Sequence, residues 1–285
     1  MGNATIRVEN VHVDYPIDGH SVRKVLNGID LEIGSGEFVS IVGQTGCGKS
    51  TLLRLILAEE PPTRGQVLVA GRARSQPDRF CGYVPQRYSL FPDKTVLQNV
   101  TFGLEVTELR PFSRLRPDGR RHLREFQVEA LRYLRHTGLA EADARKYPYQ
   151  LSGGMQQRVA IAQALILKPP ILLMDEAFSA LDPATRSGMQ RLIKELWRES
   201  GTTIVFVTHN TREAVCLGSR VIALAKGHSA EQGSSVALDL SIPNIEFDSD
   251  EEEIRALIRR VETATLPPIC TSQPVSKPVA VHAVS

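Results

Sequence analysis

Apolar and polar residues alternate near the start of the chain and later give way to short apolar runs. Thr5–Val13 and Gly28–Ile33 alternate, which predicts strands with one solvent-facing side. Glu37–Val42, Ile171–Met174 and Thr203–Val207 are short and mostly apolar, a pattern typical of parallel strands that are buried on both faces. The sequence therefore predicts both half-exposed and fully buried strands.

Helical patterns flank or separate these strands. Three helices are predicted: Lys49–Ala58, Ala184–Arg198 and Arg212–Leu217. Strands that alternate with helices indicate an α/β fold whose mostly parallel sheet is covered on both faces. Between Val96 and Leu167 the periodicity is helical, with Phe126, Ala130 and Leu134 at helical spacing. We therefore expect an inserted helical subdomain there.

The chain changes character after Lys226. Residues 229–244 are small and polar with weak strand-like alternation. Asp248–Val261 opens with acidic residues, which favour a helix N-terminus. Residues 267–285 are rich in Pro, Val and Ser, which predicts disorder. The sequence thus predicts a partly disordered C-terminal extension.

Composition narrows the classes of function. The 285 residues are 42% hydrophobic and 23% charged, as in an ordinary globular protein, and the net charge of +2 gives no strong field to recruit nucleic acid. Four cysteines lack metal-ligand spacing, which favours reduced thiols in a cytosolic setting. We see no signal peptide, and no apolar run reaches the roughly 20 residues that span a bilayer. Any membrane-spanning helices are therefore expected in another polypeptide.

A glycine-rich segment carries the clearest chemistry. It satisfies the phosphate-binding loop pattern between a buried strand and a helix: Gly43, Gln44, Thr45, Gly46, Cys47, Gly48, Lys49, Ser50 and Thr51. Glycines let backbone N–H groups wrap a triphosphate, and the helix start favours its negative charge. Lys49 is expected to bridge the β- and γ-phosphates and Ser50 to bind Mg²⁺. The alternative, a glycine-rich surface turn, does not explain this placement.

Two acidic residues follow a buried strand further along the chain. In Ile171–Glu176 four apolar residues lead to Asp175 and Glu176, at the carboxyl end where open parallel sheets bind ligands. Asp175 is expected to hold magnesium, and Glu176 to orient and deprotonate the attacking water. A solvated strand end is the alternative when this motif is taken without the phosphate-binding loop.

A second helix start has features of an anion site. In Leu151–Arg158, which reads LSGGMQQR, Ser152 suits a helix N-cap, and Gly153 and Gly154 leave the following amides unshielded. An ordinary capped helix would explain the serine but not the glycine pair. The chain therefore holds a second candidate for binding phosphate.

Together these motifs resemble the nucleotide-binding subunits of ATP-binding-cassette (ABC) transporters. The phosphate-binding loop, LSGGMQQR and ILLMDE occur in that family's order, and the resemblance runs from about Ile6 to Lys226. It implies an ATPase with ATP and Mg²⁺ as ligands and a P-loop NTPase core with an N-terminal antiparallel β-subdomain. It also implies a division into a core at 1–92 and 165–228, a helical subdomain at 93–164 and an extension at 229–285.

The resemblance assigns roles to further residues. Tyr15 stands where the family stacks an aromatic ring on adenine, although an isolated tyrosine is more often simply half-buried. Gln86 matches the glutamine that senses magnesium and the attacking water, and His209 matches the histidine that contacts the γ-phosphate. Asp182 ends a loop where two subunits touch. A second copy is implied to supply Ser152, Gly153 and Gly154 to the first copy's ATP.

The resemblance also implies partners and a location. A separate membrane-spanning permease, a homodimer and, indirectly, a solute-binding protein are implied, at the cytoplasmic side of the inner membrane. The chain is most similar to nitrate, sulfonate and taurine importers, with the quaternary-amine group next. A lipid or lipoprotein exporter motor, a non-transport ABC ATPase and a soluble P-loop kinase are the alternatives, and the kinase leaves LSGGMQQR unexplained.

The helical insert contains a run of arginines. They are Arg110, Arg114, Arg116, Arg120, Arg121 and Arg124. A solvated loop and helix face would explain them, and a contact with anionic lipid or with acidic permease loops is the sharper hypothesis.

Overall fold

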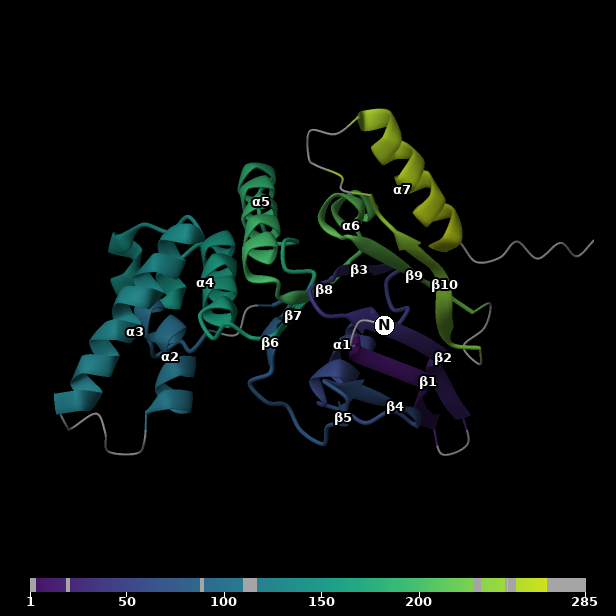
Figure 1. Cartoon of the computed structure of the whole chain (residues 1–285), viewed down its shortest axis with the longest axis horizontal. Helices are drawn as coiled ribbons and strands as arrows, with labels where there is room; N and C mark the ends of the chain where they lie inside the picture. The colour runs from purple at the N-terminus through teal and green to yellow at the C-terminus, as the bar shows by residue number, and fades with distance from the viewer. Residues whose placement is uncertain are drawn as a thin grey trace, which may run out of the picture.

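A sheet of ten strands organises the fold (Figure 1). The computed structural model describes residues 4–18, 21–87, 90–109, 117–227, 232–243, 245 and 250–265. The strands are β1 (Ala4–Asp18), β2 (Ser21–Gly34), β3 (Phe38–Gly43), β4 (Arg64–Val69), β5 (Arg72–Ala73), β6 (Cys81–Val84), β7 (Ile171–Asp175), β8 (Thr203–Thr208), β9 (Arg220–Lys226) and β10 (Ser234–Ser241). Their order across the sheet is β5-β4-β1-β2-β10-β9-β3-β8-β7-β6.

Helices follow the strands in the predicted places. They are α1 (Lys49–Leu57), α2 (Val96–Glu108), α3 (Pro117–His136), α4 (Gly153–Leu165), α5 (Pro183–Ser200), α6 (Thr211–Leu217) and α7 (Glu251–Thr265), with two 3₁₀ turns, η2 (Glu141–Arg145) and η3 (Pro148–Gln150). None of the helices in the described ranges combines the length and the apolar composition needed to cross a bilayer.

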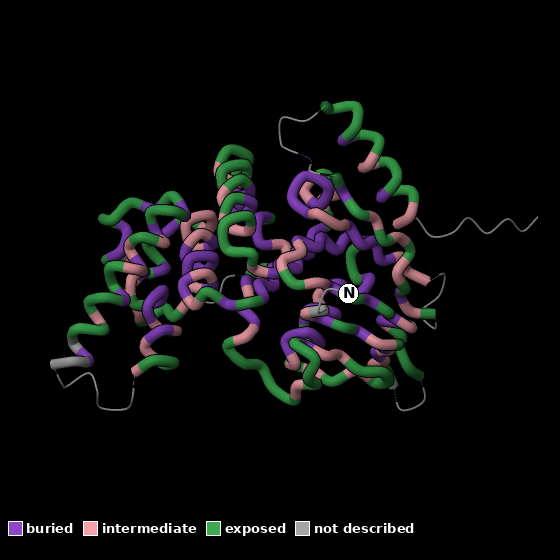
Figure 2. The backbone as a smooth tube through the Cα atoms, in the orientation of Figure 1, coloured by how far each residue is buried: buried purple, intermediate pink, exposed green. Residues whose placement is uncertain are grey.

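The parallel part of the sheet forms the centre of the fold. β9, β3, β8, β7 and β6 pair in parallel, and β3, β7 and β8 are buried along their whole length (Figure 2). Successive side chains point to opposite faces. Ile171 and Leu173 therefore pack on the face that carries α1, whereas Leu172 and Met174 pack with α5 residues on the other face. The prediction of strands buried on both faces is confirmed.

The antiparallel N-terminal part is also present. β1 pairs with β2 and with β4, and β4 pairs with β5, all antiparallel. Both long strands extend beyond the predicted segments, because register shifts between Val8 and Val11 and between Val11 and Val13 interrupt the alternation. Asn10, at φ 44°, lies within this irregular stretch. A strict period of two could therefore recognise only part of each strand.

The helical insert forms a separate apolar cluster. α2, α3 and α4 lie to one side of the sheet (Figure 1) and bury Val100, Ala130, Leu134 and Val159 among themselves. Thr95 caps α2 in a capping box with Gln98. The predicted helical subdomain is confirmed, and α4 connects it to the core because α4 also contacts β6.

The C-terminal extension contributes to the core. β10 enters the sheet between β2 and β9, and α7 packs on α6 and β9 with Ile254 and Val261 fully buried. Arg220 fastens β10 by two bonds to Asp239, at 2.7 and 2.6 Å. The predicted disorder concerns residues 267–285, which lie outside the described residues.

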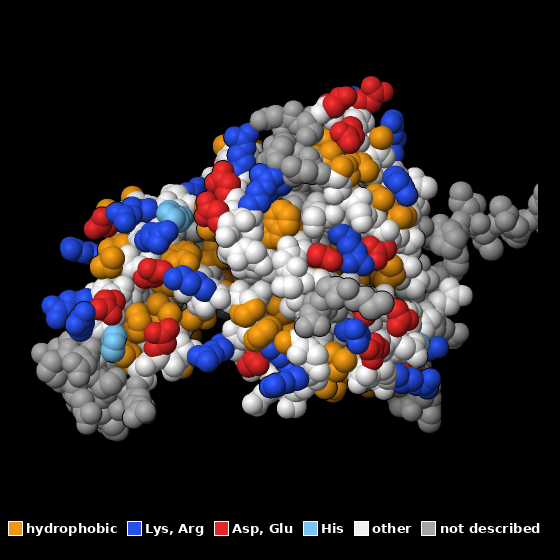
Figure 3. Space-filling view, in the orientation of Figure 1, with side chains coloured by type: hydrophobic (Ala, Val, Ile, Leu, Met, Phe, Trp, Pro, Cys, Tyr) orange, Lys and Arg blue, Asp and Glu red, His pale blue; other side chains and the backbone are white. Residues whose placement is uncertain are grey.

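The arginine run of the insert is only partly described. Residues 110–116 and the side chain of residue 120 lie outside the described parts, and Arg121 pairs with Glu125 at 3.1 Å. On the face shown in Figure 3, acidic and basic side chains are mixed over the helical subdomain. This mixture agrees with a solvated helix face in the part that is described.

Candidate active site

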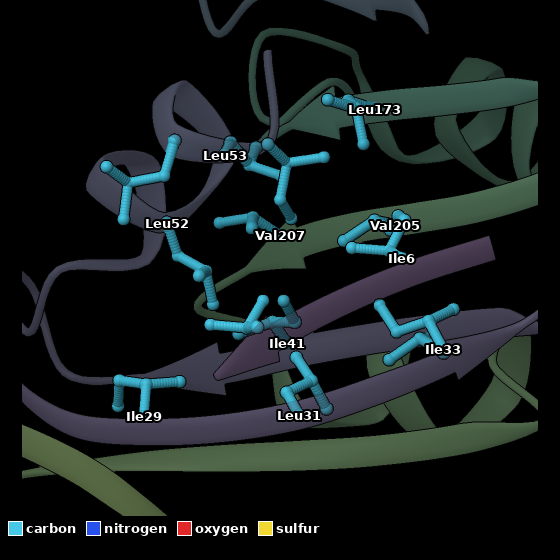
Figure 4. Close-up of a cluster of buried hydrophobic side chains, with 14 of the residues drawn as sticks. Ile6, Ile29, Leu31, Ile33, Ile41, Leu52, Leu53, Leu173, Val205 and Val207 are labelled. Atoms are coloured by element: carbon cyan, nitrogen blue, oxygen red, sulfur yellow. The ribbon is translucent and has the colours of Figure 1, made fainter. Parts of the chain in front are cut away.

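The glycine-rich segment forms a tight loop between β3 and α1. Gly46 (φ 75°) and Gly48 (φ 93°) adopt the left-handed conformation that glycine tolerates. A Cβ atom on Gly48 would lie 2.6 Å from Leu26 Cδ2, so a larger residue does not fit there. Below the loop, Leu52 and Leu53 of α1 pack in the same cluster as Ile41 of β3 (Figure 4). The apolar core therefore fixes the helix N-terminus that follows the loop.

Lys49 is folded back onto the loop that precedes it. Its Nζ donates to the carbonyl oxygens of Gly43 at 2.8 Å and Gln44 at 3.2 Å, and the side chain is buried. Cys47 is fully buried beside it, and burial raises the pKa of its thiol. A protonated, buried thiol is a poor nucleophile, so Cys47 acts in the loop as a small packing residue.

Asp175 lies buried at the end of β7, next to Ser50. Burial raises the pKa of its carboxyl, and the neighbouring Ser50 hydroxyl acts in the opposite direction. Its Oδ1 atom is buried and has no hydrogen-bond partner among the described residues. A buried carboxylate oxygen without a partner beside a hydroxyl group is a donor set that suits Mg²⁺, which prefers oxygen ligands.

Glu176 connects two segments that are far apart in the sequence. One carboxylate oxygen accepts a hydrogen bond from Gln86 Nε2 at 2.8 Å, and the other lies 3.2 Å from His209 Nδ1. The backbone of Glu176 has φ 44°, an unusual conformation for a residue with a side chain, and its N–H bonds to the Val207 carbonyl at 2.9 Å. The three predicted catalytic residues outside the loop therefore meet at one carboxylate.

Most of these groups line one cavity of about 500 Å³, but Gly43, Gln44, Cys47 and Asp175 are not in its lining. The predicted residues in its lining are Tyr15, Thr45, Gly46, Gly48, Lys49, Ser50, Thr51, Gln86, Glu176 and His209. Tyr15 reaches the cavity from β1, and its hydroxyl donates to Glu60 at 2.8 Å. Arg23, Val25 and Arg54 also line the cavity, and none of the three was predicted from the sequence. Only the hairpin register, which was not predictable, places Arg23 there.

The second predicted anion site lies apart from this cavity. Ser152 caps α4 by accepting from the Met155 N–H at 3.3 Å, but Ser152, Gly153 and Gly154 are not in the cavity lining. Asp182, which is also outside the lining, caps α5 by accepting from the Thr185 N–H at 3.0 Å. One chain therefore brings together only part of the predicted site.

Two side chains mechanically connect α4 to the rest of the molecule. Gln157 is fully buried and donates to the carbonyl of Pro85, the residue before Gln86, at 3.5 Å. Arg158 donates to Thr185 Oγ1 of α5 at 2.7 Å. A movement of the helical subdomain would therefore be transmitted to the segment that holds Gln86.

Asn210 directly follows His209 and stands at the start of α6. Its side chain caps α6, since Oδ1 accepts from the Glu213 N–H at 3.1 Å. Asparagine and aspartate are equally good at this position of a helix. Asn210 therefore stabilises the start of the helix that follows His209.

Comparison with known proteins establishes the family. A family model described as ABC transporter matches residues 26–179. An uncharacterized ABC transporter ATP-binding protein of Methanocaldococcus jannaschii is 39% identical over 258 residues, covering 89% of this chain and 91% of the relative. The chain therefore belongs to the ABC transporter family as an ATP-binding subunit, and the predicted P-loop NTPase fold and ATPase activity are confirmed.

Other relatives carry names that specify import or transport of a solute. An aliphatic sulfonates import ATP-binding protein of Pseudomonas putida is 42% identical, with 78% of this chain and 74% of the relative covered. A bicarbonate and a nitrate ATP-binding protein of Synechococcus elongatus are 40% and 38% identical over 85% and 84% of this chain. This chain spans only 35% and 34% of the length of those two.

A solved structure is similar over most of the chain. It is a dimeric ATP-binding cassette in a post-hydrolysis state, bound to ADP and phosphate. The TM-score is 0.71 at 34% identity, with 84% of this chain and 99% of the other covered.

Proposed function

We propose that this ABC ATPase powers solute import through a separate membrane permease, using an ATP site completed by a second copy of the chain. One observation carries the proposal. The cavity holds the phosphate-binding loop, Gln86, Glu176 and His209, whereas the glycine-flanked start of α4 lies outside it. A helix N-terminus can bind an anion, so the start of α4 suits a phosphate that a second molecule presents.

Different residues of the cavity bind the adenine ring and the phosphates of ATP. Tyr15 stacks on the adenine ring, and the amides of the loop surround the phosphates. Lys49, now bonded to Gly43 and Gln44, turns its ammonium group to the β- and γ-phosphates. The present acceptors are neutral carbonyl oxygens, whereas phosphate oxygens carry negative charge and therefore bind the ammonium group more strongly.

Magnesium fits next to the phosphates. Ser50 and Asp175 would hold it, with Gln86 at its edge, and the unpartnered Oδ1 of Asp175 supports this assignment. A bound Mg²⁺ neutralises charge on the phosphate oxygens. Asp175 is suited to this role because burial leaves its carboxylate in need of a positive partner.

Glu176 acts on the attacking water. Its carboxylate accepts the proton of a water aimed at the γ-phosphate, while Gln86 and His209 keep the carboxylate in position. When ATP arrives, His209 is available to bind the γ-phosphate. The strained backbone of Glu176 supports this role, since such conformations gather at functional sites.

Two copies pair head to tail around two ATP molecules. Ser152, Gly153 and Gly154 of one copy contact the γ-phosphate in the other copy, and the loop ending at Asp182 lies across the interface. ATP binds the closed pair better than the open one and therefore shifts the equilibrium toward closure. Hydrolysis weakens this contact, and the helical subdomain moves with the segment before Gln86 through Gln157.

Several relatives are named for small oxyanions, and the proposed solute is of that class. Sulfonate and nitrate relatives support a small oxyanion such as nitrate, a sulfonate or taurine, delivered by a solute-binding protein. A quaternary amine is the second candidate. The subunit acts peripherally, on the cytoplasmic side of the inner membrane.

Purification from membranes tests the proposal. Tagged chain extracted in mild detergent is expected to bring down a polytopic membrane protein whose presence stimulates ATP hydrolysis. Cells that lack the chain are expected to lose uptake of labelled nitrate or taurine. Recovery of ribosomes or DNA, with solute uptake intact, would contradict the importer function and leave the ATPase itself unaffected.

A further inference from the structure

We propose that Arg23 is a further nucleotide-binding residue whose guanidinium binds the phosphate nearest the ribose, the α-phosphate. The inference rests on the proposed function in that it takes the cavity as the ATP site. It adds a contact outside the phosphate-binding loop, on the β2 strand of the antiparallel part.

Arg23 reaches the cavity from beside Tyr15. The two residues are directly opposite in the antiparallel β1–β2 ladder, so their side chains leave the same face of the sheet. A Cβ atom on Gly46 would lie 4.0 Å from Arg23 Nη2. The arginine side chain therefore extends from the ring proposed to hold adenine to the loop proposed to hold the phosphates.

The local charges favour an anion at this place. Lys226 Nζ would lie 3.4 Å from the same Cβ position, so two cations face Gly46 from β2 and β9. The ammonium of Lys49 is bonded to loop carbonyls, and Arg54 lies 3.9 Å from Glu60. Arg23 is exposed and has no hydrogen bond or ion pair among the described residues. Cations gathered around one loop repel one another, and a bound phosphate would offset that repulsion.

Which phosphate the guanidinium contacts follows from where the Arg23 side chain begins and ends. A guanidinium offers paired N–H donors that match phosphate oxygens. Because Arg23 starts next to Tyr15 and ends at Gly46, it meets the phosphate next to the ribose before the terminal one, near which Glu176 and His209 lie. ATP and ADP share this phosphate, so the contact should serve both nucleotides equally.

Nucleotide titrations of full-length variants test the inference. Arg23→Ala is expected to lower the affinity for both ATP and ADP by about tenfold, because one charge-assisted contact to phosphate is lost. Arg23→Lys is expected to lower both affinities by less, because that contact is only reduced. In steady-state assays the ATP KM should rise much more than kcat falls. Lys24→Ala is the matched control, since Lys24 is an exposed cation on the same strand outside the cavity lining and should bind nucleotide as the wild type does.

Three outcomes would overturn the assignment. Arg23→Ala could bind both nucleotides with wild-type affinity, or it could bind ATP more weakly but ADP as the wild type does. Alternatively, Lys24→Ala could lower the affinity for both nucleotides by the same factor as Arg23→Ala. The second outcome would place the guanidinium at the γ-phosphate, and the third would make the effect one of general charge. Wild-type protein that binds no ATP would instead remove the proposed function itself. Circular dichroism on each variant confirms that it is folded.

Discussion

Glu176→Gln is expected to abolish most ATP turnover, by at least about a hundredfold, while ATP binding is retained. General bases contribute roughly 10²–10⁴ to rate, and glutamine keeps the shape of the side chain but cannot take a proton. Glutamine can still meet Gln86 and His209, which lie 2.8 and 3.2 Å from the carboxylate oxygens. Because the γ-phosphate then stays in place, the ATP-bound pair should not reopen.

Two measurements on this variant check both parts of the expectation. Phosphate release gives the turnover, and size-exclusion chromatography with ATP should show a doubled mass that ADP does not produce. Glu195→Gln, an exposed change on α5, is the control and should behave as the wild type. A variant that remains monomeric with ATP and turns over at the wild-type rate would disprove the role of Glu176.

Lys49→Ala is expected to lower ATP affinity by about a hundredfold or more. The lysine is the buried cation of the loop, so its contacts to phosphate are desolvated and each is worth about 1.5–3 kcal/mol. Alanine leaves the carbonyls of Gly43 and Gln44 without their donor, and thermal unfolding should therefore be followed in parallel.

Calorimetric titration with ATP measures this loss, with Lys24→Ala as the charge-matched control. A folded Lys49→Ala protein that binds ATP as tightly as the wild type would remove the phosphate-binding loop from the account. The ATPase activity would then have to come from a different site, even if Glu176→Gln behaved as expected.

The sequence predicted what local chemistry determines. The loop from Gly43 to Thr51 needs glycines at positions with positive φ, and Asp175 with Glu176 needs a buried strand before it. Both requirements can be recognised from residues that are consecutive in the sequence. Gln86 and His209 could be assigned only by resemblance, because they stand 90 residues before and 33 residues after Glu176, and their meeting there depends on the order of strands in the sheet.

What the sequence could not predict depends on register and on long-range packing. The shifts in the β1–β2 ladder decide that Arg23 faces Tyr15, and no period of two shows them. β10 was visible only as weak alternation, yet it enters the middle of the sheet, where Arg220 and Asp239 hold it. The burial of β10 does alternate, but its inward-facing positions after Ser234 are only half-buried, so its apolar pattern is weaker than that of β3 or β8.

The dependence of ATPase activity on chain concentration tests the central claim most directly. If each ATP is held between the loop of one molecule and the α4 start of another, the rate per chain should rise with concentration and then level off. Replacing Gly153 by aspartate, which puts a negative charge at that helix start, should abolish the rise. A constant rate per chain, equal in wild type and in Gly153→Asp, would contradict an ATP site shared by two copies.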